Sequence, residues 1–195
     1  MLVVLGVLAL VMVLGIPALQ NFIIRSRSEG FAREASTLMQ RTRLEAIKMN
    51  RAGVVHLDPA NRRLVAFIDA NRDHEFNPDP DEPPRTSDYV LGRLPLPSNV
   101  DFVDPDGFLA EDSVDGFTTV KTDLGDVQAA YFRSDGSVED LGAFRIGDVR
   151  ENFLEIRVDP SASGRIEILK YREDDDKFHS SGDPSSPDYE PWKWN

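Results

Sequence analysis

MLVVLGVLALVMVLGIPALQNFII, residues 1–24, decides the architecture of this chain because it carries no charged side chain. A helix of this length rises by ~36 Å, which exceeds the ~30 Å hydrocarbon core of a bilayer. A secretory signal peptide would have a shorter apolar core and a small-residue cleavage site after it. We therefore predict that residues 1–24 form a transmembrane helix that anchors the rest of the chain.

The helical periodicity continues beyond residue 24. Apolar or small side chains recur at steps of three and four, as on one face of an α-helix: Phe31, Ala35, Leu38, Thr42, Ala46 and Met49. Residues 25–52 are therefore predicted to form an amphipathic helix that continues the anchor, with Gly53 as its stop. Pro17 is predicted to kink the helix, because its ring removes a backbone hydrogen bond.

From residue 54 the periodicity changes to two, which is typical of β-strands. The stretch VVHLDPANRRLVAFI predicts a hairpin that turns at residues 58–61, and FLEIRV followed by GRIEILKY predicts a second hairpin around residues 159–164. Short strands are predicted between these hairpins, at residues 89–91, 99–103, 117–120, 127–132 and 144–146.

The predicted fold class is α+β, with one long N-terminal helix packed on an all-β, antiparallel two-sheet domain. The β-rich domain is predicted to cover residues 53–171. Residues 172–195 are polar and acidic, and we predict that they form a disordered tail. The alternative is that Trp192 and Trp194 dock this tail onto the domain or onto a partner.

Charge is divided unequally along the chain, whose net charge is −12. Residues 1–52 hold seven basic and three acidic side chains, a net of +4, so residues 53–195 carry −16. An acidic domain of this size repels nucleic acid and anionic surfaces. The chain has no cysteine, which excludes disulfides, thiolate metal sites and a cysteine nucleophile.

The apolar stretch LVVLGVLALVMVLGIPALQNFI, followed by a charged amphipathic helix and then strands, resembles the start of a type IV pilin or pseudopilin. LVAFIDANRDHEFNPDPDE, YFRSDGSVED and the closing hairpin are similar to the minor pseudopilin H of type II secretion and to the related T-type minor pilins. The resemblance implies a pilin-like fold in which Pro17 is the helix-kinking proline. It also implies a processing site, a glycine before a phenylalanine-led segment with a glutamate, which we expect upstream of Met1.

The resemblance further implies a non-enzymatic, single-pass protein of the bacterial inner membrane, with its globular domain in the periplasm. The implied partners are other pseudopilins or pilins, the inner membrane and the secretion machinery. The basic residues after the anchor would by themselves favour the cytoplasm for the domain. We keep the domain in the periplasm because the family's leader carries opposing basic charges.

Subunits of such a filament can pass from the membrane into a fibre because a hydrophobic helix moves from lipid into a bundle of like helices without meeting water. Repeated heterologous contacts then give an open-ended filament. Gly6 and Gly15 offer small surfaces for close helix packing. The equally weighted alternative is that these glycines are simply tolerated in a membrane helix.

Asp69, Asn71, Asp73 and Asn77 are candidate calcium ligands. With Glu75 and Asp79 they alternate oxygen-bearing side chains, and D-x-N-x-D matches the opening of a calcium loop. Two features depart from that pattern, since the sixth position lacks a glycine and Pro80 occupies the twelfth. The alternative is a solvated acidic loop whose side chains cap turns. Calcium is the only cofactor that the sequence suggests.

No catalytic motif supports an enzyme. The three histidines, His56, His74 and His179, are widely separated, and H-E-x-x-H, G-x-S-x-G and phosphate-binding loop motifs do not occur. His56 lies within an apolar strand and is interpreted as a core or edge residue rather than a ligand. A membrane-anchored periplasmic enzyme is therefore the weaker alternative.

The last alternative is a minor pilin of a type IV pilus, active in pilus assembly or DNA uptake. In relatives that take up DNA, the closing strand carries a Gly-Arg-x-Arg element. The matching residues here are Gly164, Arg165, Ile166 and Glu167, with a glutamate in place of the second arginine. Because phosphate binding needs clustered positive charge, we expect no nucleic-acid partner.

Overall fold

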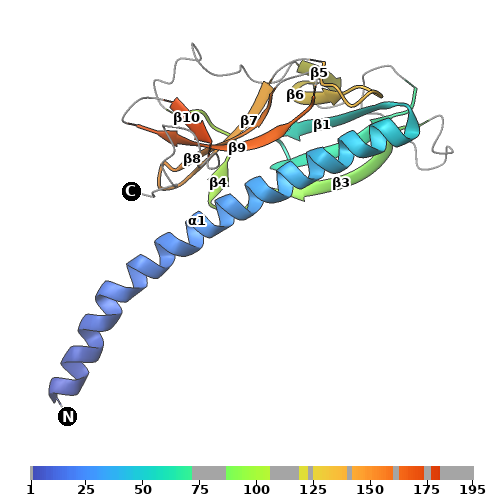
Figure 1. Cartoon of the computed structure of the whole chain (residues 1–195). Helices are drawn as coiled ribbons and strands as arrows, with labels where there is room; N and C mark the ends of the chain where they lie inside the picture. Colours follow the sequence, from blue (N-terminus) through green and yellow to red (C-terminus); the bar gives the residue numbers. More distant parts are fainter. Residues whose placement is uncertain are drawn as a thin grey trace.

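The computed structural model describes residues 2–71, 87–105, 119–122, 125–139, 142–159, 163–173 and 177–180, and for residues 2–18, 119–122 and 125–127 it describes the backbone only. This part of the chain forms one helix and two five-stranded antiparallel sheets. The C-terminal half of the helix contacts both sheets, and its N-terminal half projects beyond them (Figure 1). The expected α+β class, a long N-terminal helix packed on two antiparallel sheets, is confirmed.

Helix α1 spans Leu2–Met49 without interruption, so a single helix covers most of both predicted helical segments. It is capped by the next residue, Asn50, whose φ of 50° is left-handed. The N–H groups of Asn50 and Arg51 donate to carbonyls of the last helical turn at 3.2 and 3.1 Å, which is a Schellman cap. The prediction that Gly53 stops the helix is wrong, because asparagine also tolerates the left-handed conformation and caps the helix earlier.

One stripe of α1 is buried against the sheets. The helical side chains that are at most 3% exposed are Ser28, Phe31, Ala32, Ala35, Met39, Thr42 and Ala46. Four of the six predicted stripe residues belong to this set, and Leu38 packs at its margin. Met49 is 38% exposed, so its place in the predicted stripe is wrong. The helix ends at this residue, beyond the deepest contacts with the sheets.

The first sheet has the strand order β3-β2-β1-β6-β5. Its strands are β1 (Ala52–Asp58), β2 (Arg63–Asp69), β3 (Tyr89–Pro95), β5 (Thr119–Thr122) and β6 (Gly125–Phe132). The predicted first hairpin is confirmed, because β1 and β2 pair antiparallel along their whole length, from Ala52 opposite Asp69 to Asp58 opposite Arg63. Its turn is held by the Asp58 carboxylate, which accepts hydrogen bonds from the backbone and side chain of Asn61.

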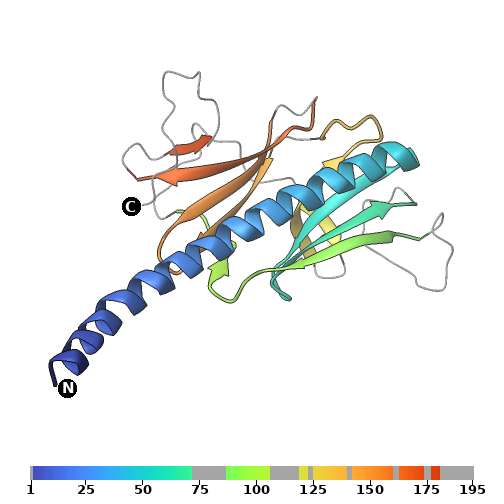
Figure 2. The same cartoon turned by 60° about the horizontal axis from the view of Figure 1, so that its bottom comes forward.

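The second sheet has the strand order β10-β9-β8-β7-β4. Its strands are β4 (Val100–Asp101), β7 (Gly142–Asp148), β8 (Phe153–Val158), β9 (Ile166–Arg172) and β10 (Lys177–Ser180). The predicted closing hairpin is β8 and β9. Figure 2 shows β9 and β10 on one side of the path of α1 and β2 and β3 on the other.

Strand β10 corrects the predicted domain boundary at residue 171. The prediction of a disordered tail is wrong for residues 177–180, because they pair with β9 and extend the second sheet. Phe178 is 9% exposed and its ring lies 5.3 Å from that of Tyr171. Burial of this aromatic side chain stabilises β10. The sequence does not predict this strand because the acidic residues beside it are typical of a disordered tail.

The main core lies between α1 and the inner faces of both sheets. It includes Phe31 and Met39 from the helix, Ile68 and Phe132 from the first sheet, and Ile156 from the second. Because one helix supplies the common partner for both sheets, the two sheets and the C-terminal half of α1 form one packing unit.

Strand β1 approaches α1 closely at Gly53. A Cβ atom there would lie 2.9 Å from Thr42 Cγ2 and 3.1 Å from Ala46 Cβ. Glycine therefore serves the packing of strand on helix rather than the end of the helix.

Candidate functional site

The N-terminal half of α1 is the main candidate for function. Three of its described side chains are both apolar and exposed, since Leu19 is 60%, Phe22 67% and Ile23 40% exposed. An isolated surface Leu or Phe needs no explanation, but three on one projecting helix form an unpartnered apolar segment. Such a segment is suited to lipid or to another apolar helix.

The helix enters the domain at Ser28. This side chain is 1% exposed, and its hydroxyl lies 3.3 Å from the carboxylate of Asp148 at the end of β7. The same carboxylate accepts hydrogen bonds from the backbone N–H groups of Arg150 and Asn152, which fixes the turn between β7 and β8. The point where α1 leaves the sheets is thus held by a polar contact to a structured turn.

Several predictions for the anchor fall on residues whose side chains are not described. Residues 1–18, most of the predicted transmembrane span, are in this group, and within the remainder of the described chain no helix is both long and apolar enough to cross a membrane. Gly6 and Gly15 as packing positions therefore stay predictions. The backbone of α1 is helical through Pro17, and the predicted kink there also stays a prediction.

The candidate calcium loop begins at the end of β2. Asp73 and Asn77 lie outside the described residues, so only Asp69 and Asn71 can be placed. Asp69 is fully buried, and its carboxylate accepts a 3.2 Å hydrogen bond from the Tyr131 hydroxyl. Asn71 is exposed. Among the described residues, no group of three or more acidic, histidine or cysteine side chains could hold a metal ion. Calcium binding by this loop stays a prediction.

The two ends of this loop are tied together at its base. The N–H of Ala70 donates to Asp88 Oδ1 at 3.1 Å, and Ser87 and Asp88 are each only 5% exposed. This contact joins the two described ends of the loop and does not by itself create a metal site. The acidic residues of the loop are recognisable in the sequence, whereas nothing in the sequence marks Asp88, beyond the loop, as buried.

His56 is 1% exposed in β1, which confirms the interpretation as a core residue. Its ring lies 5.7 Å from the ring of Phe67, on the face of the first sheet turned away from α1. Burial lowers the pKa of His56 to about 4, with Asp58 opposing and Arg63 adding to the shift. The side chain is therefore neutral at neutral pH. His179 lies half-buried in β10, and His74 lies outside the described residues.

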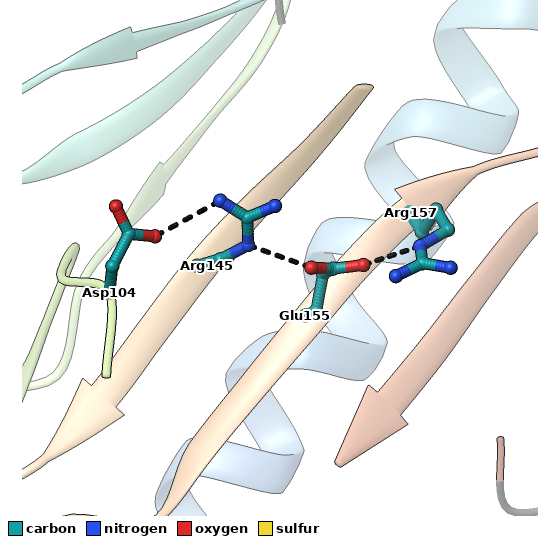
Figure 3. A network of polar contacts seen from close by, with 4 residues as sticks. All are labelled: Asp104, Arg145, Glu155 and Arg157. Atoms are coloured by element: carbon teal, nitrogen blue, oxygen red, sulfur yellow. Dashed lines mark hydrogen bonds and ion pairs between the residues drawn. The ribbon is translucent and has the colours of Figure 1, made fainter. Parts of the chain in front are cut away.

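The second sheet contains a buried ionic network that the sequence did not predict. Glu155 on β8 is fully buried and is flanked by two arginines, Arg145 on β7 and Arg157 on β8 (Figure 3). The Glu155 carboxylate lies 2.7 Å from Arg145 Nε, and Arg145 also reaches Asp104 at 3.2 Å.

The only sequence signal for this network is a glutamate and an arginine at paired positions of adjacent predicted strands, which a solvated sheet face also explains. Phe178 covers Arg145, with the guanidinium carbon 5.8 Å from the ring centroid. The network lies on the outer face of the second sheet, and the pairing of the buried Glu155 with both arginines indicates a structural role.

Comparison of the chain with protein-family models, with curated proteins and with solved structures gave no match.

Proposed function

We propose that the protein is a minor pseudopilin of a type II secretion system, which assembles through the N-terminal half of α1 into a periplasmic pseudopilus. One observation carries the proposal: a single helix packs its C-terminal half on two sheets while its N-terminal half projects with exposed apolar side chains. The helix is anchored in the inner membrane before assembly, and the domain lies in the periplasm.

The exposed apolar side chains of the projecting helix gain free energy when they leave water. Burying a Leu, Ile or Phe side chain is worth about 1.5–3 kcal/mol, so Leu19, Phe22 and Ile23 favour any arrangement that removes them from water. Both lipid and a bundle of like helices do this. Transfer between these two environments has little hydrophobic cost, which suits reversible recruitment of subunits from a membrane.

The domain contributes a rigid body at the end of this helix. Its core unites both sheets with α1, so a force applied along the helix is transmitted to the whole domain. A minor pilin of a type IV pilus has the same requirements and is the alternative. The charge of −16 on residues 53–195 disfavours DNA uptake as its role.

Photo-crosslinking in the host cell tests the proposal. Phe22 is replaced by the photoreactive analogue benzoylphenylalanine, which retains an aromatic side chain at a 67% exposed position. Val149, also 67% exposed but located on the turn after β7, provides the matched control position. We expect the probe at Phe22 to crosslink to the helix of another filament subunit, and only when the secretion system is present.

Three outcomes decide between the alternatives. Crosslinks at Phe22 that require secretion genes, with few at Val149, support a pseudopilin. Crosslinks that require pilus genes instead transfer the protein to the type IV pilus. Crosslinks at Phe22 to lipid alone in cells with both systems active would refute assembly through the helix.

A further inference from the structure

The two tryptophans of the chain have no part in the proposed filament helix. Trp192 and Trp194 belong to residues 181–195, which follow β10 and lie outside the described residues. In an extended segment, residues two apart point to the same side and are ~6.6 Å apart. A tryptophan side chain has ~150–250 Å² of surface to bury, so two of them on one side favour contact with an apolar surface.

The domain offers an apolar groove between α1 and β3, which run side by side (Figure 1). The groove encloses about 340 Å³ and is lined by Gly92 and Leu94 on the strand side and by Leu38 on the helix side, with Thr37 and Arg41 at its rim. Leu38 and Leu94 are partly buried and pack against the main core. The floor of the groove is therefore apolar and continuous with the core.

Gly92 gives the groove its depth. The pairing of β3 with β2 places Gly92 opposite Ala66 and Leu94 opposite Leu64, and both partners belong to the core beneath α1. A Cβ atom at Gly92 would lie 3.1 Å from Leu38 Cδ1, so a larger side chain would fill the space. Glycine thus leaves room on the floor of the groove for a flat ring.

The rim of the groove suits an indole better than a charged ligand. Arg33 is paired with Glu29 at 3.5 Å, and Glu34 also lines the groove, so the charges around it offset one another. Arg41 is exposed, and a guanidinium group can stack on the face of an indole. An apolar floor beside one such cation favours a tryptophan side chain.

The C-terminal segment is long enough to reach this groove. Trp192 is twelve residues beyond Ser180, the last residue of β10, and twelve extended residues span up to ~40 Å. A domain of about 150 residues has a radius of gyration of only ~15 Å. Because β9 and β10 lie on one side of the path of α1 and β3 on the other, the direct route crosses the helix (Figure 2).

Charge favours this route across α1. Residues 25–52 hold seven basic and three acidic side chains. Residues 181–191 hold three acidic side chains and no basic one. The acidic part of the segment would therefore lie over the basic helix, and the tryptophans that follow it would reach the groove beyond. The tether through β10 also keeps the tryptophans at a high effective concentration near the domain.

We propose that residues 181–195 fold back across α1 and place Trp192 and Trp194 in the groove between α1 and β3 of the same chain. The docked segment would cover β3, an outermost strand of the first sheet among the strands that the structure describes. The open edge of such a strand can pair with another extended chain, and the cover prevents this. The proposal goes beyond filament assembly through α1 and does not depend on it.

Intrinsic fluorescence of the full chain in non-ionic detergent tests the proposal, because all tryptophan emission comes from the C-terminal segment. In Gly92→Leu, which fills the groove, the emission should shift to longer wavelength, and acrylamide should quench it at least twofold more strongly than in the wild type. Arg93→Leu is the matched control, since Arg93 lies opposite Val65 on the face of the same strand that is turned away from α1, and it should change neither. Gly92→Ala should give a smaller shift in the same direction if circular dichroism shows that Gly92→Leu has lost its fold.

A nitroxide spin label locates the docked segment. The chain has no cysteine, so Gln40→Cys and Arg150→Cys each provide a single labelling site at an exposed position. Gln40 lies one helical turn beyond Thr37, next to the groove but not in its lining, whereas Arg150 lies on the turn between β7 and β8. Nitroxides quench tryptophan only at short range. The label at Gln40→Cys should therefore quench the emission at least twofold more than the label at Arg150→Cys.

Three results would overturn the proposal. Equal quenching by acrylamide in the wild type and in folded Gly92→Leu and Gly92→Ala would mean that the tryptophans lie in water or in detergent. Equal or stronger quenching by the label at Arg150→Cys would place them elsewhere on the domain. Quenching of the wild type by a labelled Gln40→Cys chain that also carries Trp192→Phe and Trp194→Phe would show docking on a second copy. None of these results bears on crosslinking at Phe22, so each proposal can fail without the other.

Discussion

Arg43 on α1 donates a hydrogen bond from Nε to the carbonyl oxygen of Gly136, at 2.7 Å. Gly136 follows β6 of the first sheet, with a left-handed φ of 84°. Gly164, in the turn between β8 and β9 of the second sheet, packs against both groups. One side chain of the helix therefore meets turns from both sheets at a single point, where neither glycine leaves space for a side chain.

Gly164→Ala should destabilise the fold by about 2–3 kcal/mol. The φ of Gly164 is 55°, and an added Cβ would lie 2.6 Å from the Gly136 carbonyl oxygen and 2.9 Å from Arg43 Nε. The substitution thus combines backbone strain with a clash against backbone. Thermal unfolding of the full chain in detergent, followed by near-UV circular dichroism, measures the effect.

Gly30→Ala is the matched control for this substitution. Gly30 lies within α1, and a Cβ there meets nothing within 4 Å. Alanine favours a helix interior over glycine by about 1 kcal/mol, so this variant should unfold at a higher temperature than the wild type. A similar loss of stability in both variants would contradict the assigned role of the Arg43 contact.

Calcium and magnesium should stabilise the protein to the same small extent. The carboxylate of Asp69 is buried and engaged by Tyr131, and the loop sequence lacks the glycine of a calcium loop, so we expect both ions only to screen an acidic domain. Asp73→Ala should leave this effect nearly unchanged. A calcium-specific rise in unfolding temperature that follows mass action and is lost in Asp73→Ala would establish a metal site instead.

The fold was largely predictable because its signals are periodic. The change from a period of 3.6 to a period of two near residue 54 separates α1 from the sheets, and the turn at Asp58 carries its own polar cap. The prediction failed at two places where the deciding interaction leaves no periodic pattern in the sequence. Asn50 caps α1 through one unusual dihedral angle, and β10 is stabilised by packing of Phe178 on Tyr171.

The candidate sites were less predictable than the fold. Arg145, Glu155 and Arg157 are charged residues on strands, so their pattern suggests a solvated face, and only the pairing of β7 with β8 brings them together. The contact between Ser28 and Asp148 likewise joins two distant elements, and it cannot be inferred before the packing of α1 against β7 is known.

His56 should make the protein less stable as the pH falls from about 6.5 to about 4. Burial lowers its pKa from 6.5 to about 4, so the unfolded chain takes up a proton in this range while the folded chain does not. The gap between the two values corresponds to about 3 kcal/mol of stability that is present at pH 7 and is lost toward pH 4.

His56→Gln isolates this contribution, since glutamine remains polar and does not titrate. The stability of this variant should depend less steeply on pH than that of the wild type between pH 6.5 and 4, whatever its absolute stability. Denaturant unfolding at several pH values provides the slopes. Identical slopes in the two proteins would show that His56 takes up its proton equally in both states.

Glu155→Gln should be among the most damaging polar substitutions on the outer face of the second sheet. The variant keeps the shape of the side chain but removes the negative charge that lies between Arg145 and Arg157, whose side chains are only 9% and 15% exposed. Removing one partner of a buried ion pair costs about 3–5 kcal/mol, because the remaining charges stay buried without compensation.

Glu139→Gln is the matched control, since its ion pair with Arg133 is 3.9 Å long and exposed and should contribute at most about 1 kcal/mol. Denaturant unfolding of both variants distinguishes the two cases. Equal, small losses would mean that solvent reaches the Glu155 network and that β10 does not seal it.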